Sequence, residues 1–465
     1  MQKDLRTFLN KIKTQYPEKY FEVEEKLDRD YEIGAVQELL AAKGKYPVVF
    51  YKNVEKSPMP MVSSLFASYE LLGHALDVDG NEHEEILQTY IKRESNPLPM
   101  QEIAKADAPV KAQIFTGDKI DLDQVPISIH NELDSGRYIS SGNLICIDPD
   151  SGVPNVGIYR MEVKNKNTLS WMVNPASHAA YIYRRHCELK KRMEVAIFIG
   201  HHPAVVLGSS SRGKLDEHNE LETMGGLLNE PLQVVKAETV NINVPAYAEI
   251  VIEGYLDPGE MTQDGPFGEY AGYYGPEKEV AVLHVTAITM RKDPIYHDIR
   301  PSFREHTLAG VLGREAHMYK KVKEIIPTLK ALHLPPSGAS FYHLYMSIKK
   351  TVEGYGKFAA LAALGVNYDL KHVFVFDEDI NIYDNEQVLW AVATRVQGDI
   401  DISMIPYTFG AQLDPSSYAE DNRAGKGKLT TRVIIDATKP FHTEFPKVVK
   451  VPQEVSDKVS KMLNL

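Results

Sequence analysis

The stretch Asp264-Gly265-Pro266-Phe267-Gly268-Glu269-Tyr270 places two carboxylates five residues apart across a Gly-Pro-Phe-Gly turn. Because a Gly-Pro pair does not continue a helix, the stretch is predicted to be a tight loop. Such a loop can direct Asp264 and Glu269 into one space while Phe267 anchors it on an apolar surface. Two carboxylates with different pKa values suit proton transfer near neutral pH. The alternative is an ordinary solvated turn, for which Asp, Gly and Pro are common residues.

The composition is that of a soluble globular protein of several domains. The 465 residues exceed what one core holds, and 43% hydrophobic with 25% charged residues is an ordinary balance. A net charge of −12 disfavours a nucleic-acid or anionic-membrane partner. Two cysteines form neither a disulfide framework nor a thiolate zinc site, which indicates the cytoplasm. No apolar run reaches the roughly 18 residues of a membrane span, so no membrane partner is expected.

The first segment, 1–110, is predicted to be an N-terminal α/β domain. Helical spacing of apolar residues covers 3–13 and 61–76, and 46–51 has the pattern of a short buried strand. The stretch 96–109 is rich in Pro and Ala and is interpreted as a linker.

The second segment, 111–305, changes to short strands separated by Gly, Pro and Asp turns, which predicts a β-barrel or sandwich. Two helices are expected to interrupt the strands, at 178–192 and 216–228. The expected strands are 138–147, 156–163, 195–199, 204–207, 240–244, 248–256 and 280–290.

The third segment, 306–440, alternates strand and helix, as an α/β domain does. Its clearest strand, 372–376, is a continuous apolar run typical of a central parallel strand. Helices are expected at 359–364 and 384–395. The remainder, 441–465, is predicted to be a C-terminal extension with a docking helix over 451–465.

Within the β-rich segment, Asn155 and Arg160 have opposite parity in a strand, and a bend at Gly157 could bring both to one site. The alternative is a plain strand with a surface arginine. Pro175-Ala-Ser177-His178 opens a helix that Ser177 can cap and whose start favours anions. There His178 could bind a metal, or it could be a structural residue.

The loop Gly208-Ser-Ser-Ser-Arg-Gly-Lys214 offers backbone N–H groups, hydroxyls and two cations, all suited to a phosphate. The alternative is a flexible linker. Glu217 and Glu220 follow at helical positions. An Asn, a His and a Glu together would suit Mn²⁺ or Mg²⁺ better than zinc. These features indicate a phosphorylated cofactor and acid–base chemistry on a carboxylate substrate.

These segments, in this order, resemble the UbiD-type decarboxylases, which use prenylated FMN. The resemblance covers nearly the whole chain and is strongest over 155–272 and in the acidic strand end 375–384 followed by 390–395. It implies an α/β (mixed α+β) multidomain fold. An N-terminal α/β part, a split β-barrel that holds the cofactor and a C-terminal α/β domain that dimerises would follow one another.

The resemblance also implies the ligands of the site. Asn155, His178 and Glu220 match the metal ligands, with Mn²⁺ or Mg²⁺ bridging them to the cofactor phosphate and K⁺ nearby. Met224 replaces the Ala usual in the family. The implied cofactor contacts are Asn155, Ile158, Tyr159, Arg160, Ser177, His178, Ser210, Ser211, Arg212 and Glu220.

The implied reaction is reversible, non-oxidative decarboxylation of an aromatic, heteroaromatic or α,β-unsaturated acid through a covalent flavin adduct. Arg160 would orient the carboxylate and Glu269 would protonate the carbon that CO₂ leaves. Asp264 stands where the family commonly has Glu and would complete the acid–Arg–acid network.

The substrate pocket is expected to include Tyr270, His297, Arg304 and His306, whose polarity favours a hydroxylated or heteroaromatic acid. The alternative for the last three is a domain interface. A flavin-phosphate carrier without turnover is the second function considered, and a metal-dependent hydrolase the third. A flavin prenyltransferase would supply the cofactor, and the family forms homodimers or hexamers.

Overall fold

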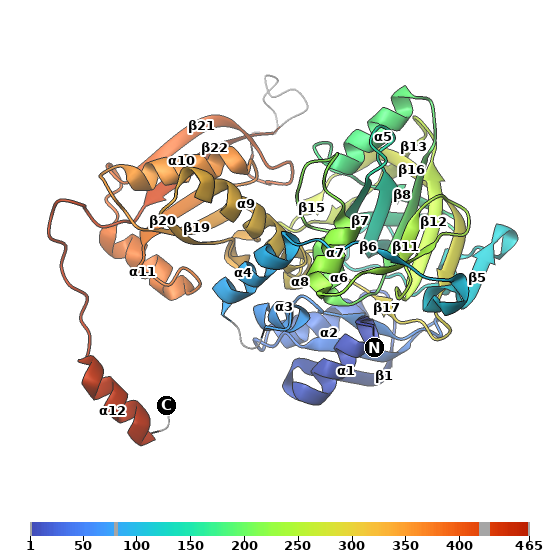
Figure 1. Cartoon of the computed structure of the whole chain (residues 1–465), viewed down its shortest axis with the longest axis horizontal. Helices are drawn as coiled ribbons and strands as arrows, with labels where there is room; N and C mark the ends of the chain where they lie inside the picture. The colour runs from blue at the N-terminus through green and yellow to red at the C-terminus, as the bar shows by residue number, and fades with distance from the viewer. Residues whose placement is uncertain (1, 79–81, 418–427, 464–465) are drawn as a thin grey trace.

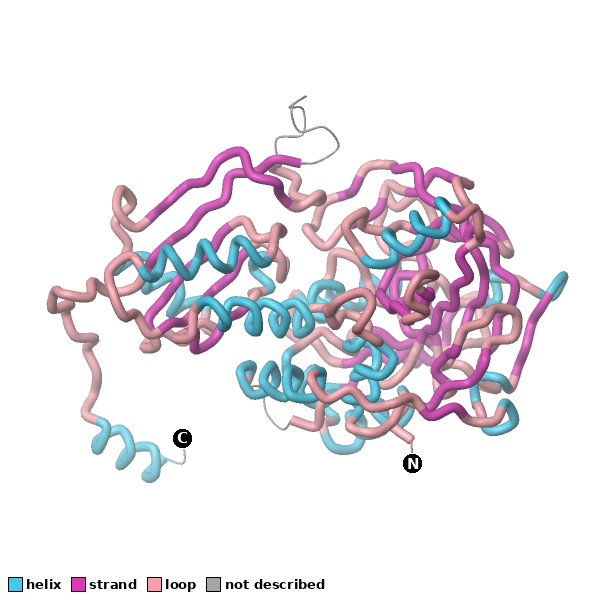
Figure 2. The backbone as a smooth tube through the Cα atoms, turned by 45° about the horizontal axis from the view of Figure 1, so that its top comes forward, coloured by secondary structure: helices cyan, strands magenta, loops and turns pink. Residues whose placement is uncertain are grey.

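The computed structural model describes residues 2–78, 82–417 and 428–463 and has three parts (Figure 1). A β-barrel forms one side of the molecule, the N-terminal part packs beneath it, and the C-terminal α/β part lies beside it. Figure 2 shows the strands of the barrel gathered on one side and the sheet of the C-terminal part on the other. Helix α4 (His83–Glu94) lies where the parts meet.

The N-terminal part is a four-stranded sheet with helices. The sheet order is β1 (Tyr20–Leu27), β2 (Val48–Val54), β3 (Met61–Ser63) and β17 (Tyr296–His297). Its helices are α1 (Leu5–Gln15), α2 (Glu32–Ala41) and α3 (Tyr69–Ala75), together with α4. The helix expected over 61–76 is correct only at α3, because residues 61–63 pair with β2 and β17 instead.

Helix α1 forms because the residues at its N-terminus cap it and its apolar residues recur at helical spacing. The Asp4 carboxylate accepts a hydrogen bond from the Thr7 N–H at 2.8 Å, and the Thr7 hydroxyl accepts one from the Asp4 N–H at 2.9 Å. The apolar residues recur every three or four positions, and Leu5, Phe8 and Ile12 are fully buried.

The central part contains a closed six-stranded barrel, which confirms the predicted fold class. Its strand order is β12–β9–β6–β7–β8–β16, and pairing of β12 with β16 closes the ring. The barrel strands are β6 (Tyr138–Ile147), β7 (Pro154–Asn165), β8 (Thr168–Trp171), β9 (Met193–Ile199), β12 (Ile250–Leu256) and β16 (Lys278–Met290). Closure leaves no free edge on the ring, so its inward side chains are held in fixed positions.

Further elements decorate the barrel. The helices are α5 (His178–Glu188), α6 (Pro203–Gly208) and α7 (Glu220–Leu228). The shorter strands are β4 (Gln101–Glu102), β5 (Gln113–Thr116), β10 (Gln233–Lys236), β11 (Asn243–Pro245), β13 (Met261–Asp264), β14 (Phe267–Gly268) and β15 (Tyr274–Gly275).

The strand expected at 204–207 is wrong, because this segment lies in α6. Pro203 occupies the first turn of α6, and the His202 ring accepts a hydrogen bond from the Ala204 N–H. A short apolar run buried on all sides has no periodicity that separates helix from strand. The strand expected at 240–244 overlaps β11 by only two residues.

The C-terminal part is a five-stranded sheet in the order β18 (Leu329–His333), β19 (His343–Ile348), β20 (His372–Asp377), β22 (Lys428–Asp436) and β21 (Ile402–Gly410). Strand β20 is parallel to both neighbours, as predicted. The helices are α8 (Arg304–Leu308), α9 (Val311–Ile325), α10 (Tyr355–Val366) and α11 (Asn385–Arg395).

The last helix, α12 (Gln453–Leu463), buries no residue. It stands away from the rest of the chain at the end of an extended segment, and its docking role stays a prediction (Figure 1). None of the helices that the structure describes has the length and apolar content to span a membrane. The domain boundaries at 110, 305 and 440 stay predictions.

Candidate active site

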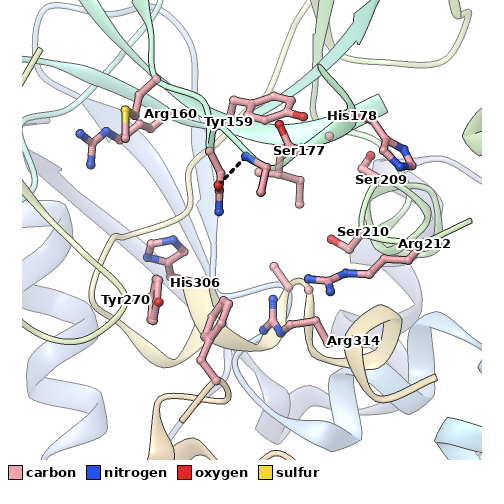
Figure 3. A pocket seen from close by; sticks show the side chains of 18 of the residues that line it. Tyr159, Arg160, Ser177, His178, Ser209, Ser210, Arg212, Tyr270, His306 and Arg314 are labelled. Carbon is pink, nitrogen blue, oxygen red and sulfur yellow. Dashed lines mark hydrogen bonds between the residues drawn. The ribbon is translucent and has the colours of Figure 1, made fainter. Parts of the chain in front are cut away.

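A cavity of ≈ 870 Å³ lies between barrel strand β7 and the helices α8 and α9 (Figure 3). This volume is in the range of pockets that hold cofactors and small molecules. Most of the site residues predicted from the sequence line it. They are Asn155, Ile158, Tyr159, Arg160, Ser177, His178, Ser210, Ser211, Arg212, Glu220, Glu269, Tyr270 and His306.

Arg160 connects the two acids of the Gly-Pro-Phe-Gly loop. Its Nη2 donates a hydrogen bond to Asp264 Oδ1 at 2.7 Å, and its Nη1 forms an ion pair with the Glu269 carboxylate. The guanidinium lies over the Phe267 ring, 4.5 Å from the ring centre. Both acids and the aromatic anchor of the loop therefore hold one arginine.

Asn155 and Arg160 both line the cavity despite their opposite parity in the strand, as do the four residues between them. The β6–β7 pairing shifts between Ile139 and Gly142, so an extra residue of β6 lies opposite Arg160. No shift occurs at Gly157, where the sequence suggested a bend. The bulge thus lies in the partner strand, which the β7 sequence does not reveal.

The loop itself is held by hydrogen bonds from three directions. The Gly268 N–H donates to Asp134 Oδ1 at 2.8 Å, and the Ser135 N–H donates to the Pro266 carbonyl at 2.9 Å. The Ser302 hydroxyl donates to the Glu269 carbonyl at 2.7 Å. These contacts fix the direction in which the Glu269 side chain leaves the backbone.

The two acids have different surroundings. Glu269 lines the cavity, and burial raises the pKa of its carboxyl, although the charge of Arg160 opposes the increase. Asp264 is fully buried behind Arg160 and also accepts a hydrogen bond from the Ser170 hydroxyl at 2.5 Å. The geometry therefore separates an acid that faces the cavity from one that holds the arginine.

Asn155, Glu220 and His178 supply oxygen and nitrogen donors on another wall. Asn155 Nδ2 donates to Glu220 Oε1 at 2.8 Å. Among the described residues, Asn155 Oδ1 and Glu220 Oε2 are buried without a hydrogen-bond partner. Such orphaned oxygens, with the His178 imidazole lining the same cavity, fit a hard divalent cation such as Mn²⁺ or Mg²⁺.

The protonation of this donor set suits a cation as well. Burial raises the pKa of Glu220 to about 8, so a positive charge beside it would restore the carboxylate. Burial and the charge of Arg212 lower the pKa of His178, which keeps the imidazole neutral and able to coordinate. Ser177 caps α5 through the Ala180 N–H at 3.2 Å, which places His178 at the start of the helix.

The Ser-rich loop lines the cavity over residues 209–213, and its hydroxyls differ in what they contact. The Ser209 hydroxyl donates to Asn143 Oδ1 at 2.7 Å, and the Ser211 hydroxyl donates to the Gly208 carbonyl at 2.8 Å. Ser210 and Arg212 point toward the cavity (Figure 3). The hydroxyls of Ser209 and Ser211 therefore shape the loop, and Ser210 and Arg212 are available to a ligand.

The opposite wall comes largely from the C-terminal part. The Tyr270 ring stacks on Phe341 with ring centres 3.9 Å apart, and His306 meets Tyr270 edge-on at 6.5 Å. Burial, with the nearby charge of Arg314, lowers the pKa of His306 to about 4, so this ring is neutral near pH 7.

Several residues of the cavity wall were not predicted from the sequence. No local sequence motif indicates a binding or catalytic role for them, because each lies in an ordinary helix, strand end or loop. They are Met172, Lys278, Arg314, His317, Phe341, Tyr368 and Gln412.

Two predicted pocket residues lie elsewhere. His297 is fully buried against the Phe66 ring and lies 3.7 Å from Glu305. The Arg304 guanidinium stacks on Tyr46 at 4.7 Å. Neither residue lines the cavity, and both contact the N-terminal part, as the interface alternative expected.

Three sequence families match the chain in succession. They are the N-terminal, Rift-related and C-terminal domains of 3-octaprenyl-4-hydroxybenzoate carboxy-lyase (UbiD), matched over residues 15–90, 101–302 and 306–437. The chain belongs to the UbiD family. It is therefore a carboxy-lyase of the UbiD class.

UbiD-family relatives match over almost their full length. An anhydromevalonate phosphate decarboxylase of Methanothermobacter thermautotrophicus is 32% identical over 94% of this chain and 97% of its own. A phenolic acid decarboxylase of Sedimentibacter hydroxybenzoicus is 29% identical over 95% of this chain and 92% of its own.

A solved UbiD-class structure has the same fold. It is the enzyme HmfF from Pelotomaculum thermopropionicum in complex with FMN, with a TM-score of 0.91 and 37% identity over 99% of this chain and 100% of that chain. A dimeric form of HmfF evolved from it is in complex with prFMN.

Proposed function

We propose that this protein reversibly decarboxylates an aromatic, heteroaromatic or α,β-unsaturated carboxylic acid with prenylated FMN bound in the cavity. The observation that carries the proposal is the Asp264–Arg160–Glu269 network at the cavity wall. The binding of FMN and prFMN by HmfF supports the choice of cofactor. When bound, the prenylated flavin would supply the electron sink for the electron pair left by carbon–carbon cleavage.

Arg160 binds and orients the substrate carboxylate. Its planar guanidinium matches a carboxylate with two parallel hydrogen bonds. Asp264 and the Phe267 ring hold the guanidinium in place, so little reorientation is needed when the substrate arrives.

Glu269 delivers the proton. The bond between the substrate carbon and its carboxyl group breaks, CO₂ leaves, and the carbon takes a proton from the Glu269 carboxyl. The raised pKa of Glu269 keeps more of the acid form near neutral pH than an exposed Glu would have. In the carboxylation direction the carboxylate takes the proton back.

Asn155, His178 and Glu220 would hold a divalent cation, Mn²⁺ or Mg²⁺, that helps to bind the phosphorylated cofactor. The orphaned oxygens of Asn155 and Glu220 support this assignment. Ser210 and Arg212 line the same cavity and would contact the cofactor phosphate, and K⁺ is the second cation expected. Ile158, Tyr159 and Ser177 line the same cavity and would contact the flavin.

A flavin-phosphate carrier is the second candidate, since the cation site and the Ser-rich loop would suffice for it. The buried acid pair on Arg160 disfavours a carrier. Three charges at the cavity wall are costly to desolvate and serve no purpose in phosphate binding.

The protein would receive its cofactor from a flavin prenyltransferase and assemble as a homodimer or hexamer. A dimeric form of HmfF and a decarboxylase of two components are among the similar structures. The two free cysteines agree with a reducing compartment, and we place the protein in the cytoplasm.

The test is to co-express the chain with a flavin prenyltransferase in the presence of Mn²⁺ and K⁺. Bound flavin is identified by absorbance and by the mass of the released ligand. Aromatic, heteroaromatic and unsaturated acids are then supplied in D₂O. Deuterium at the former carboxyl carbon of one product is the expected result, and bound flavin without deuterium in any product would favour the carrier.

Glu269→Gln should abolish deuterium incorporation and leave the flavin content unchanged, because Gln cannot supply the proton. Glu277→Gln is the matched control, since Glu277 is an exposed residue a few positions further along. Turnover retained in Glu269→Gln would refute the role of the acid.

A further inference from the structure

We propose that Arg314 binds a second anionic group of the substrate, at the end of the cavity remote from the carboxylate that leaves. This inference rests on the proposed function, since it specifies the substrate of the same cavity. The ligand class is an unsaturated or aromatic acid that also carries a phosphate monoester or a second carboxylate.

Arg314 is a buried cation that lines the cavity without an acid partner. It is 8% exposed, and its Nη2 donates to the Thr307 carbonyl at 2.7 Å. Within residues 2–78, 82–417 and 428–463, no carboxylate lies within ion-pair distance of it. Burial lowers the pKa of Arg314 to about 10, so it remains charged near pH 7. A buried unpaired charge is costly unless a ligand completes it.

The surrounding charges leave this end of the cavity positive. Arg212 also lines the cavity, and Figure 3 shows its guanidinium beside that of Arg314. Burial raises the pKa of the nearby Asp369, and the positive charges of Arg212, Arg314 and Arg432 oppose this increase. One carboxylate shared among three arginines leaves room for a further anion.

The position of Arg314 is fixed by packing. Its guanidinium lies on the Phe341 ring at 3.9 Å, and Phe341 stacks on Tyr270, the neighbour of the proposed proton donor. A Cβ added at Gly310 would lie 2.8 Å from Arg314 Nη1 and 3.2 Å from Ser210 Oγ. The absence of a side chain at Gly310 therefore leaves open the space between these two polar groups.

The chemical class of the second anionic group of the substrate follows from the shape of the Arg314 guanidinium. Its planar edge suits two oxygens of a phosphate or carboxylate. Three relatives, which are 32%, 35% and 37% identical to this chain, are anhydromevalonate phosphate decarboxylases, and the acid in that name is phosphorylated. The cofactor phosphate is assigned to other residues, namely Asn155 on β7, Glu220 at the start of α7, Ser210 and Arg212, which leaves Arg314 for the substrate.

The experiment compares acids that differ only in the remote group. The first pair is anhydromevalonate phosphate and anhydromevalonate, and the second pair is terephthalate and benzoate. Binding is measured by calorimetry on the Glu269→Gln holoenzyme, so no turnover is needed. Arg314→Met and Arg314→Lys are introduced into this background. Arg192→Met, which removes a surface arginine paired with Asp257, is the matched control.

The doubly anionic member of at least one pair should bind about 10- to 100-fold more tightly, as expected for a charge-assisted contact. Arg314→Met should remove this preference, Arg314→Lys should retain part of it, and flavin content should not change. Equal binding within both pairs, or a preference that survives Arg314→Met, would overturn the proposal. Loss of flavin from Arg314→Met and Arg314→Lys would assign the residue to the cofactor phosphate and also overturn it.

A failure of the proposed function has a different signature. In that case the wild-type holoenzyme would incorporate no deuterium into any acid, while the binding preference and its loss in Arg314→Met would persist.

Discussion

Replacing Asp264 with Asn tests whether Asp264 holds Arg160 in place while Glu269 donates the proton. The substitution keeps the shape of the side chain and removes its charge. Arg160 then has Glu269 as its remaining carboxylate partner. We expect lower stability, lower activity and a shifted pH profile, each for a separate physical reason.

The magnitudes follow from the burial of the pair. The Asp264 side chain is 0% exposed and that of Arg160 10%, and they lie 2.7 Å apart. Removing one partner of a buried pair costs about 3–5 kcal/mol. Because Glu269 still compensates the arginine, we expect about 3 kcal/mol, the lower end of that range. Misorientation of the guanidinium should cost one charge-assisted hydrogen bond, or about 10- to 100-fold in kcat/KM.

The pH profile provides the sharper assay. Glu269 must be protonated to act, and the negative charge of Asp264 helps to raise its pKa. In Asp264→Asn that contribution is lost, so the pKa of Glu269 falls and the proton donor is lost at lower pH. The basic limb of the kcat/KM profile should therefore move to lower pH.

Ser170→Ala is the matched control. It removes the hydroxyl that donates to Asp264 at 2.5 Å and leaves the carboxylate charge in place. It should cost about 1 kcal/mol of stability without moving the basic limb to lower pH. A basic limb of Asp264→Asn that stays in place or moves to higher pH would refute the assigned roles.

Three further changes test other parts of the structure. Glu220→Gln should lower the bound Mn²⁺ measured by elemental analysis, because it removes a ligand charge, and an unchanged metal content would contradict the cation site. Gly310→Ala should raise KM for the substrate with little change in kcat, because its Cβ would press on Arg314 Nη1, and an unchanged KM would contradict that packing. Phe8→Ala should destabilise the protein by about 3–5 kcal/mol in denaturant titration, whereas Val459→Lys on the exposed α12 should change stability by less than about 0.5 kcal/mol.

The parts predicted correctly from the sequence depend on local signals. The Gly-Pro-Phe-Gly loop, the Ser177 cap before His178 and the apolar strand 372–376 each carry their own pattern of residues. The family resemblance that these patterns carry predicted thirteen site residues that line one cavity.

The parts that escaped prediction depend on contacts between distant segments. Closure of the barrel by β12 and β16, and the bulge in β6 opposite Arg160, are properties of strand pairing. Arg314 lies in a helix that reads VLGREAHMYKKVKEI, where one arginine among several cations resembles a solvated surface residue. His297 and Arg304 were polar residues near the site in sequence, yet the backbone directs both toward the N-terminal part.

The extended segment before α12 has a practical consequence for the purified protein. Residues 447 and 450 are lysines in an exposed stretch without regular secondary structure, and α12 beyond them buries nothing. An exposed segment without the backbone hydrogen bonds of a helix or sheet enters a protease active site without prior unfolding. Brief trypsin treatment should therefore separate the last helix from the rest of the chain.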